Sequence, residues 1–216
     1  MKWDNEFALS ILPELFNGLL VTLQVTFAGI AIALVIGLVV AVVRYVRIPV
    51  LSHVFNFYVQ FVRGTPLLVQ AYTVFFILPD YGLTLSPLLT GIIVMGVNYS
   101  AYTAEVYRAG IEGVDKGQWE ASTALSLPSR ATWTRIVLPQ AVRTIVPMQG
   151  NYLIQMFKDS AILFAITVIE LLGAAQTIGS SNFRYLEPLT LAALLFLAIS
   201  YPASVLVRRL ERRLVG

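Results

Sequence analysis

The sequence contains no cysteine, one histidine and few charged residues of either sign. The absence of cysteine excludes disulfides, zinc–thiolate sites and cysteine nucleophiles. His53 is the single histidine, which argues against a histidine-based metal site or catalytic triad. Charged residues are 12% and hydrophobic residues 57% of the 216 residues, against roughly 25% and 45–50% in soluble domains. Such a chain buries its apolar surface in lipid as well as in a protein core.

The formal net charge of +3 does not indicate nucleic-acid binding, because the basic residues fall in clusters between hydrophobic runs. A cleavable signal peptide would need a basic start and a short apolar core. Here Asp4, Glu6 and Glu14 precede an uncharged run that continues to Val43. The run is too long for a signal peptide and predicts a membrane span that is retained.

Five helical spans are predicted, because a helix needs about 20 apolar residues to cross a hydrocarbon core of roughly 30 Å. The second carries Arg63 near one end, and the fourth contains Lys158 and Asp159. We therefore expect an all-α integral membrane protein with one transmembrane domain over residues 1–216 and a long loop at about 108–140. The predicted spans are residues 15–43, 57–78, 84–107, 142–161 and 188–207.

The orientation follows from the basic residues, which favour the cytoplasmic side. With the N-terminus outside, 12 of the 15 lysines and arginines fall in inner segments. The outer segments hold only Lys2 and Arg184, and Lys158 lies within the membrane. The pattern predicts an N-out, C-in arrangement.

The inner loop at 108–140 is expected to hold two short helices, one over Gly117–Leu127 and one that Ser129 caps and that ends around Pro139. Trp119, Leu125 and Leu127 are large apolar residues on a loop that should face water. Two interpretations stay open: they pack on the protein's own inner surface, or they dock a soluble partner.

Part of this loop resembles the EAA loop of bacterial ABC-importer permeases. That signature is Glu-Ala-Ala, a Gly six positions after the Glu, and Ile-x-Leu-Pro ten positions after the Gly. The chain has Glu120-Ala121-Ser122, then Ser126, then residues 136–139 (IVLP). It departs at Ser122, and at Ser126 where the family prefers Gly.

Residues 63–70 (RGTPLLVQ), 101–108 (AYTAEVYR), 138–141 (LPQA) and 158–160 (KDS) resemble segments of the polar amino-acid subfamily. The resemblance covers nearly the whole chain from about Leu15. It implies a type I importer fold in a bacterial cytoplasmic membrane, with two ABC ATPases, a second permease (identical or paralogous) and an extracytoplasmic solute-binding protein. The chain has no Gly-x-x-x-x-Gly-Lys-[Ser/Thr] loop, so ATP and Mg²⁺ would bind the partner ATPase and no cofactor would bind here.

The resemblance also implies site residues, none of them catalytic or metal-binding. Coupling to the ATPase would use an exposed inner helix, and the solute would pass a polar pocket near the middle of the membrane. The implied coupling residues are Glu120, Ala121, Ser122, Leu125 and Ser126. The implied pathway residues are Asn98, Tyr102, Tyr152, Gln155, Lys158, Asp159 and Ser160.

Helical spacing supports this pathway, because residues three or four apart share one face of a helix. Asn98 and Tyr102 form one such pair, and Gln155 and Asp159 another. An ionisable residue within a span is a functional candidate by default, although a structural ion pair or a snorkelling pair at a helix end would also explain Lys158 and Asp159. Relatives that import cationic amino acids often have an acidic residue where this chain has Tyr152.

These residues favour a polar amino acid or a related zwitterion, such as a compatible solute of the ectoine type, moved inward by alternating access. Two alternatives remain. A proton-coupled secondary carrier would use Asp159, but such carriers usually have paired repeats and none is visible here. A membrane-embedded enzyme would need a cluster of catalytic groups that the chain does not supply.

Overall fold

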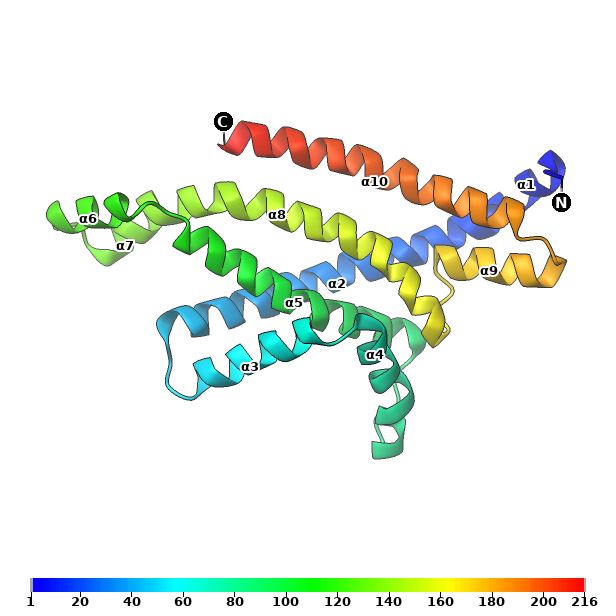
Figure 1. Cartoon of the computed structure of the whole chain (residues 1–216), viewed down its shortest axis with the longest axis horizontal. Helices are drawn as coiled ribbons and strands as arrows, with labels where there is room; N and C mark the ends of the chain where they lie inside the picture. The colour runs from blue at the N-terminus through cyan, green and yellow to red at the C-terminus, as the bar shows by residue number, and fades with distance from the viewer. Residues whose placement is uncertain (1, 216) are drawn as a thin grey trace.

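The computed structural model describes residues 2–215, and the regular structure in this range is helical. The long helices run along the longest axis of the molecule, with α6 and α7 at one end and α1 and α9 at the other (Figure 1). The all-helical fold predicted from the sequence is confirmed. The elements are α1 (Asn5–Ser10), α2 (Leu12–Val46), α3 (Leu51–Gly64), α4 (Leu67–Tyr72), η1 (Thr73–Ile77), η2 (Leu78–Tyr81), α5 (Pro87–Glu112), α6 (Lys116–Ala124), α7 (Ser129–Ala131), η3 (Thr132–Val137), α8 (Leu138–Asp159), η4 (Ser160–Ile166), α9 (Leu171–Asn182) and α10 (Leu186–Val215).

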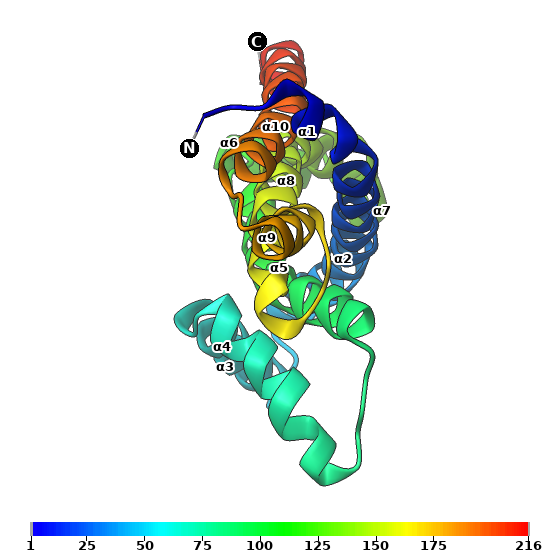
Figure 2. The same cartoon turned by 90° about the vertical axis from the view of Figure 1, so that its right-hand side faces the viewer.

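Within residues 2–215, α2 and α10 are each long and apolar enough to cross a membrane. Two bent helix pairs pass the same test together, one built from α3 and α4 and one from α8 and α9, so up to four spans follow from length and composition. The helix α5 is not among them; it carries the buried polar residues Asn98, Ser100 and Thr103. Figure 2 shows α2, α5, α8, α9 and α10 gathered in one bundle, with α3 and α4 to one side.

The helices α2 and α5 pack closely because glycines face the partner helix. A Cβ atom built on Gly37 would lie 2.6 Å from the Cγ2 atom of Thr103, and one built on Gly96 would lie 2.7 Å from the Cβ atom of Ile32. Neither position has room for a larger residue while the backbones keep this distance. Small residues at such contacts are the usual means by which membrane helices approach.

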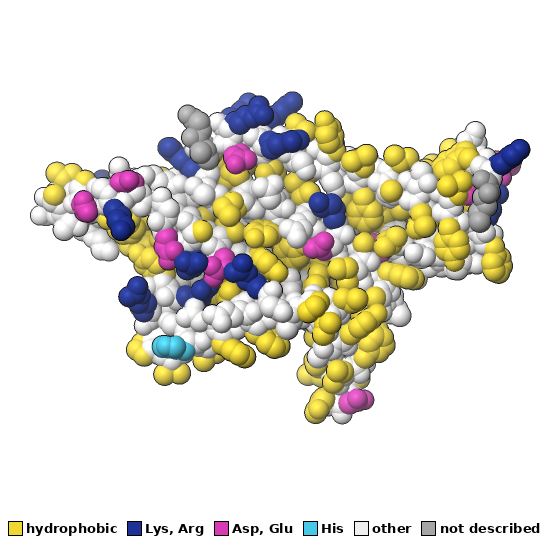
Figure 3. All heavy atoms as spheres, in the orientation of Figure 1, with side chains coloured by type: hydrophobic (Ala, Val, Ile, Leu, Met, Phe, Trp, Pro, Cys, Tyr) yellow, Lys and Arg dark blue, Asp and Glu magenta, His cyan; other side chains and the backbone are white. Residues whose placement is uncertain are grey.

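The span expected at 57–78 is not one continuous helix. The chain bends by 105° between α3 and the segment that begins with α4. Pro66 explains the break, since proline has no N–H and forces the preceding residue out of the helical region. Thr65 is accordingly extended, with φ −113° and ψ 141°. The segment after the break projects from the bundle and carries exposed hydrophobic side chains at Tyr72, Phe76 and Tyr81 (Figure 3).

The second inner-loop helix differs from its prediction at both ends. Pro128 rather than Ser129 precedes α7, with no side-chain cap, and the helix continues past Pro139 into α8. A π-helical turn over Thr132–Val137 places Pro139 in the first turn of α8, where a proline breaks no hydrogen bond of that turn. The loop and the fourth predicted span are therefore joined by one helical path.

An element not predicted from the sequence, α9, is fixed by the buried carboxylate of Glu170. This carboxylate accepts hydrogen bonds from the backbone N–H groups of Leu172 at 2.9 Å and Gly173 at 2.7 Å. The Oγ1 atom of Thr22 on α2 accepts the N–H of Leu171 at 3.1 Å. The N–H groups of the first turn of α9 thereby have hydrogen-bond acceptors inside the bundle, and the turn is attached to α2.

Candidate functional site

A cavity of about 500 Å³ opens between the break after α3 and the facing sides of α5 and α8. This volume suits a small organic molecule, since ligand pockets commonly measure about 300–1,000 Å³. Its wall combines tyrosine rings with amides, one guanidinium group and one carboxylate. The lining residues are Arg63, Gly64, Thr65, Pro66, Leu67, Asn98, Tyr99, Tyr102, Tyr152, Gln155 and Asp159.

The broken segment forms one wall of the cavity and is attached to α5 by Gln70. The amide nitrogen of Gln70 donates to the carbonyl of Val62 at 2.9 Å and to the Oγ1 atom of Thr65 at 2.7 Å. These bonds replace helical hydrogen bonds lost at the break. The Oε1 atom of Gln70 accepts from the amide of Asn98 at 3.2 Å. Asn98 therefore joins α5 to the break as well as lining the cavity.

Three tyrosines form the opposite wall. The ring centroids of Tyr99, Tyr102 and Tyr152 are 5.7–6.1 Å apart, the spacing of tilted and edge-to-face aromatic contacts. The buried hydroxyl of Tyr99 donates to the Oδ2 atom of Asp159 at 2.6 Å, so that the Asp159 carboxylate is held in a fixed orientation.

The cavity presents one charge of each sign. Arg63 contributes the cation, and its guanidinium carbon lies 5.4 Å from the centroid of the Tyr102 ring, within cation–π distance. Asp159 contributes the anion from the far end of α8. A small molecule with separate positive and negative groups can be neutralised at both ends in this cavity.

The structure brings together five of the seven predicted pathway residues, which are Asn98, Tyr102, Tyr152, Gln155 and Asp159. The other two lie elsewhere. Lys158 is exposed and does not line the cavity, as expected for a side chain that points about 100° away from its neighbour on a helix. Ser160 is fully buried, and its hydroxyl donates to the carbonyl of Phe157 at 2.8 Å.

Arg63 and Tyr99 are cavity residues that the sequence analysis did not single out as site residues. Tyr99 lies three positions before Tyr102, so the helical spacing that paired Asn98 with Tyr102 could have found it. The sequence places Arg63 near one end of the second predicted span, and only the bend after α3 shows that it meets α5 and α8.

A network of ion pairs is centred on Glu105 of α5. Its Oε1 atom lies 2.6 Å from the NH1 atom of Arg44 on α2, and its Oε2 atom lies 2.6 Å from the NH2 atom of Arg108. Glu105 and Arg108 are three residues apart on α5, a spacing that places them on one face of the helix. Arg63 lies farther off, at 3.9 Å from Oε2. Figure 3 shows basic and acidic side chains gathered in the half of the molecule toward α6.

The helix α6 and the turn that follows it present four of the five predicted coupling residues to solvent, namely Glu120, Ala121, Leu125 and Ser126. Leu125 is 72% exposed, against 37% for Leu127. The fifth, Ser122, is 3% exposed, and its hydroxyl donates to the carbonyl of Gln118 at 2.7 Å. Ser122 thus faces the chain's own interior.

Of the apolar loop residues, Trp119 packs on the protein's own surface, as the first of the two interpretations expects. Trp119 packs edge-on against Trp133 with 5.4 Å between ring centroids, and Trp133 packs against Tyr45 of α2 at 5.2 Å. Trp119 therefore fixes α6 to the rest of the chain through Trp133. Leu125 makes no comparable contact and stays exposed.

The backbone conformation of Ser126 explains why the signature prefers glycine at this position. Ser126 has a φ of 52°, in the left-handed region that glycine adopts without a steric penalty. The N–H of Ser126 donates to the carbonyl of Thr123 at 2.9 Å, and the N–H of Leu127 donates to that of Ser122 at 3.0 Å. This pair of bonds is a Schellman motif that ends α6. Ser126 therefore forms this turn although it is not a glycine.

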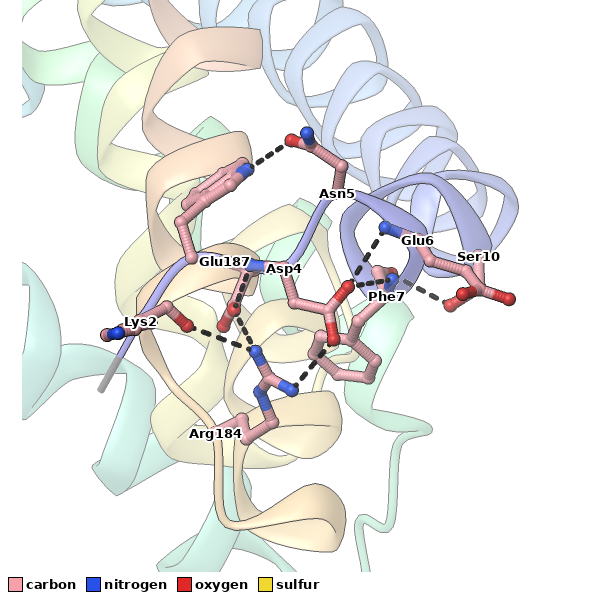
Figure 4. Close-up of polar contacts among 9 residues, drawn as sticks. Lys2, Asp4, Asn5, Glu6, Phe7, Ser10, Arg184 and Glu187 are labelled. Atoms are coloured by element: carbon pink, nitrogen blue, oxygen red, sulfur yellow. Dashed lines mark hydrogen bonds and ion pairs between the residues drawn. The ribbon is translucent and has the colours of Figure 1, made fainter.

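At the opposite end of the molecule, α1 and the start of α10 are joined by Arg184 (Figure 4). Its guanidinium pairs with the Oδ2 atom of Asp4 at 3.2 Å and with the buried carboxylate of Glu187. It also lies 4.9 Å from the centroid of the Phe7 ring. The backbone N–H of Phe7, together with Arg184, lowers the pKa of the Asp4 carboxyl, which favours the ionised form that binds Arg184.

Residues 33–216 match the family described as binding-protein-dependent transport system inner membrane component. A probable amino-acid ABC transporter permease of Sinorhizobium fredii is 42% identical over 211 residues, covering 95% of this chain and 91% of the relative. A probable glutamine ABC transporter permease of Bacillus subtilis is 37% identical over 216 residues, covering 99% of both chains.

A solved structure is similar over the same length. A chain from the crystal structure of an amino acid ABC transporter with histidines superposes with a TM-score of 0.94 at 34% identity. The match covers 99% of this chain and 100% of that chain. The cavity and the inner loop therefore both lie within the region shared with these relatives.

Proposed function

Since this chain belongs to the family of binding-protein-dependent inner-membrane transport components, we propose that it carries a zwitterionic amino acid through the cavity between α3, α5 and α8. It is the permease subunit of an amino-acid ABC importer, an inner-membrane component without catalytic chemistry of its own, and ATPase subunits accompany it. The predicted family and function are confirmed. The solute, the path and the contacts with partners are proposed below.

The observation that carries the proposal is the placement of Arg63 and Asp159 on one cavity of about 500 Å³. An amino acid carries a carboxylate and an ammonium group, which match the guanidinium of Arg63 and the carboxylate of Asp159. The tyrosine rings and the amides of Asn98 and Gln155 would surround its side chain. The similarity to a glutamine permease and to a transporter solved with histidines supports a polar amino acid. A compatible solute of the ectoine type has the same pair of charges.

For topology we propose one transmembrane domain with five spans, the N-terminus outside and the C-terminus inside. Arg184 and Asp4 meet at one end of the molecule, and α6 lies at the opposite end (Figure 1). This arrangement agrees with a split of basic residues in which Lys2 and Arg184 are outside. The second of the five spans would be the broken pair of α3 and α4.

For coupling, the exposed surface formed by Glu120, Ala121 and Leu125 would dock on a partner ATPase. Two ATPases that close on ATP would then move α6. The motion would pass along the continuous path of α7 and η3 to α8, the helix that carries Gln155 and Asp159. A second permease, identical or paralogous, and an external solute-binding protein would complete the complex. The cavity would open alternately to the two sides.

Uptake of radiolabelled L-glutamine and L-histidine into proteoliposomes tests this function. The assembled complex with its binding protein is expected to accumulate at least one of them when ATP is enclosed, and to lose this uptake when the ATPase phosphate-loop lysine is replaced. A proton gradient without ATP is expected to drive none. Uptake that follows the proton gradient and ignores ATP would instead establish the secondary carrier that uses Asp159.

Cysteine labelling tests the topology. A cysteine at Tyr81, which is 83% exposed, should react with an impermeant thiol reagent in intact cells, and a cysteine at Lys116 only after the membrane is opened. Tyr81 is preferable to the neighbouring Gly82, whose φ of 82° disfavours any side chain. The chain has no cysteine of its own, so the unaltered protein is the control. Labelling at Lys116 in intact cells contradicts the proposed orientation.

A further inference from the structure

Three arginines surround the carboxylate of Glu105, and they lie at different distances from it. Arg44 and Arg108 each lie 2.6 Å from one of its carboxylate oxygens, the distance of a strong charged hydrogen bond. Arg63 lies 3.9 Å from the oxygen that Arg108 already occupies. At that distance the attraction is electrostatic without a hydrogen bond. Arg63 is therefore the loosely held member of the network.

Arg63 is also the member that reaches the cavity. Its side chain is 45% exposed, against 14% for Arg44, and it lines the cavity with its guanidinium group over the Tyr102 ring. An incoming carboxylate can therefore meet Arg63 without displacing Arg44 or Arg108. The network contains three arginines and two glutamates, the second being Glu112, so one positive charge is left for such an anion.

The helix α3 does not depend on Arg63 for its place in the fold. The hydroxyl of Tyr58 donates to the carbonyl of Val97 at 3.0 Å and lies 2.6 Å from the Oγ atom of Ser100. Asn56 accepts from the Nε atom of Arg44 at 2.6 Å. These bonds fix α3 to α5 and α2, so the Arg63 side chain can change partner while the helices stay in contact.

We propose that Glu105 is a positioning residue that competes with the solute carboxylate for Arg63. When the cavity is loaded, the Arg63 guanidinium moves to the solute, and when the cavity opens inward, Glu105 draws it back and favours release. Glu105 touches no solute and acts only through Arg63. This inference rests on the proposed function, in which an amino acid occupies the cavity.

The test compares Glu105→Gln with Glu112→Gln in the purified permease–ATPase complex. Both variants remove one carboxylate from the network, but Glu112 pairs with Arg108 and has no contact with Arg63. Equilibrium dialysis with radiolabelled L-glutamine and L-histidine gives the Kd, and uptake per assembled complex gives the turnover. Glu105→Gln is expected to bind about fivefold more tightly, the effect of losing one partly exposed competing charge, yet to turn over more slowly. Glu112→Gln should change neither quantity.

A structural role for Glu105 predicts the opposite sign, since a disordered cavity would bind the solute more weakly. Weaker or unchanged binding in Glu105→Gln overturns the inference. If Glu105→Gln does not assemble, Glu105→Asp takes its place, because the shorter side chain keeps the negative charge but reaches less far toward Arg63, which already lies 3.9 Å away. The amino-acid amides provide a further readout: without the carboxylate, their affinity should be the same in both variants and in the unaltered complex.

The proposed function and this inference can fail separately. If neither labelled amino acid binds the unaltered complex or responds to Asp159→Asn, the cavity is not the solute site and the role of Glu105 falls with it. If Asp159→Asn abolishes uptake while the two glutamate variants behave alike, the solute site stands and only the competition for Arg63 is wrong.

Discussion

Asp159→Asn is expected to lower transport per assembled complex about 30-fold or more, equivalent to the roughly 2 kcal/mol of a hydrogen-bonded charge lost from a poorly solvated site. Asparagine keeps the shape of the side chain and can still accept the hydroxyl of Tyr99, so the fold loses little. What it cannot do is neutralise the ammonium group of a solute. Uptake in proteoliposomes, normalised to the amount of assembled complex, measures the effect.

Two variants make this result interpretable. Asp80→Asn removes a carboxylate from the segment that projects beyond α4, away from the cavity lining, and should leave transport unchanged. Tyr99→Phe removes the hydroxyl that orients Asp159 and should reduce transport less than Asp159→Asn does. A lower yield of complex with normal uptake per complex would assign Asp159 a structural role and leave the solute site open.

Glu120→Lys is expected to abolish transport and to release the ATPase, while the permease remains in the membrane. Glu120 is exposed on α6, so the substitution changes the charge of the docking surface and leaves the interior intact. A bulky residue at the neighbouring exposed Ala121 should have the same effect, because a close-packed contact tolerates little added volume. Co-purification of the ATPase and ATP hydrolysis by the complex are the measurements.

Glu211→Lys is the matched control, since it reverses one exposed charge on the same proposed side of the membrane but outside α6. It should leave ATPase binding unchanged. A bulky residue at Ser122 is a different experiment, because Ser122 is buried and the substitution would disturb the fold of the loop. Normal ATPase binding and normal hydrolysis in Glu120→Lys would show that α6 is not the docking surface.

The sequence predicted the long helices best where a run of apolar residues is uninterrupted. The helix α2 contains such a run, since the predicted span at 15–43 lies inside the observed Leu12–Val46. The break after α3 was missed although Pro66 is visible in the sequence. An apolar run shows that a segment is long enough to span a membrane, but it does not show where the chain bends. The helix α9 was missed because small and polar residues such as Gly173 and Ser180 interrupt its apolar pattern, and its first turn is stabilised by a distant contact with Thr22.

The cavity could be predicted where its residues share one helix face. Asn98 with Tyr102 and Gln155 with Asp159 are spaced for this, and all four line the cavity. The contribution of Arg63 could not be predicted in this way, since it depends on a bend of 105° in another part of the chain. Residues on the same helix face as a cavity residue are better candidates for the cavity than its neighbours in sequence. Lys158, next to Asp159 in sequence, is exposed and does not line the cavity.

The contact of Asp4 with Arg184 joins residues 180 positions apart, so it sets an order of events during synthesis. At about 5–20 residues per second, a ribosome needs roughly 9–36 s to travel from one to the other. For that interval α1 has no ionic partner at its end of the molecule, whereas α2 can already pair with α5. The end of the molecule that carries α1 is therefore among the last parts to be completed, and a nascent chain stopped before Arg184 should leave its first residues accessible to protease.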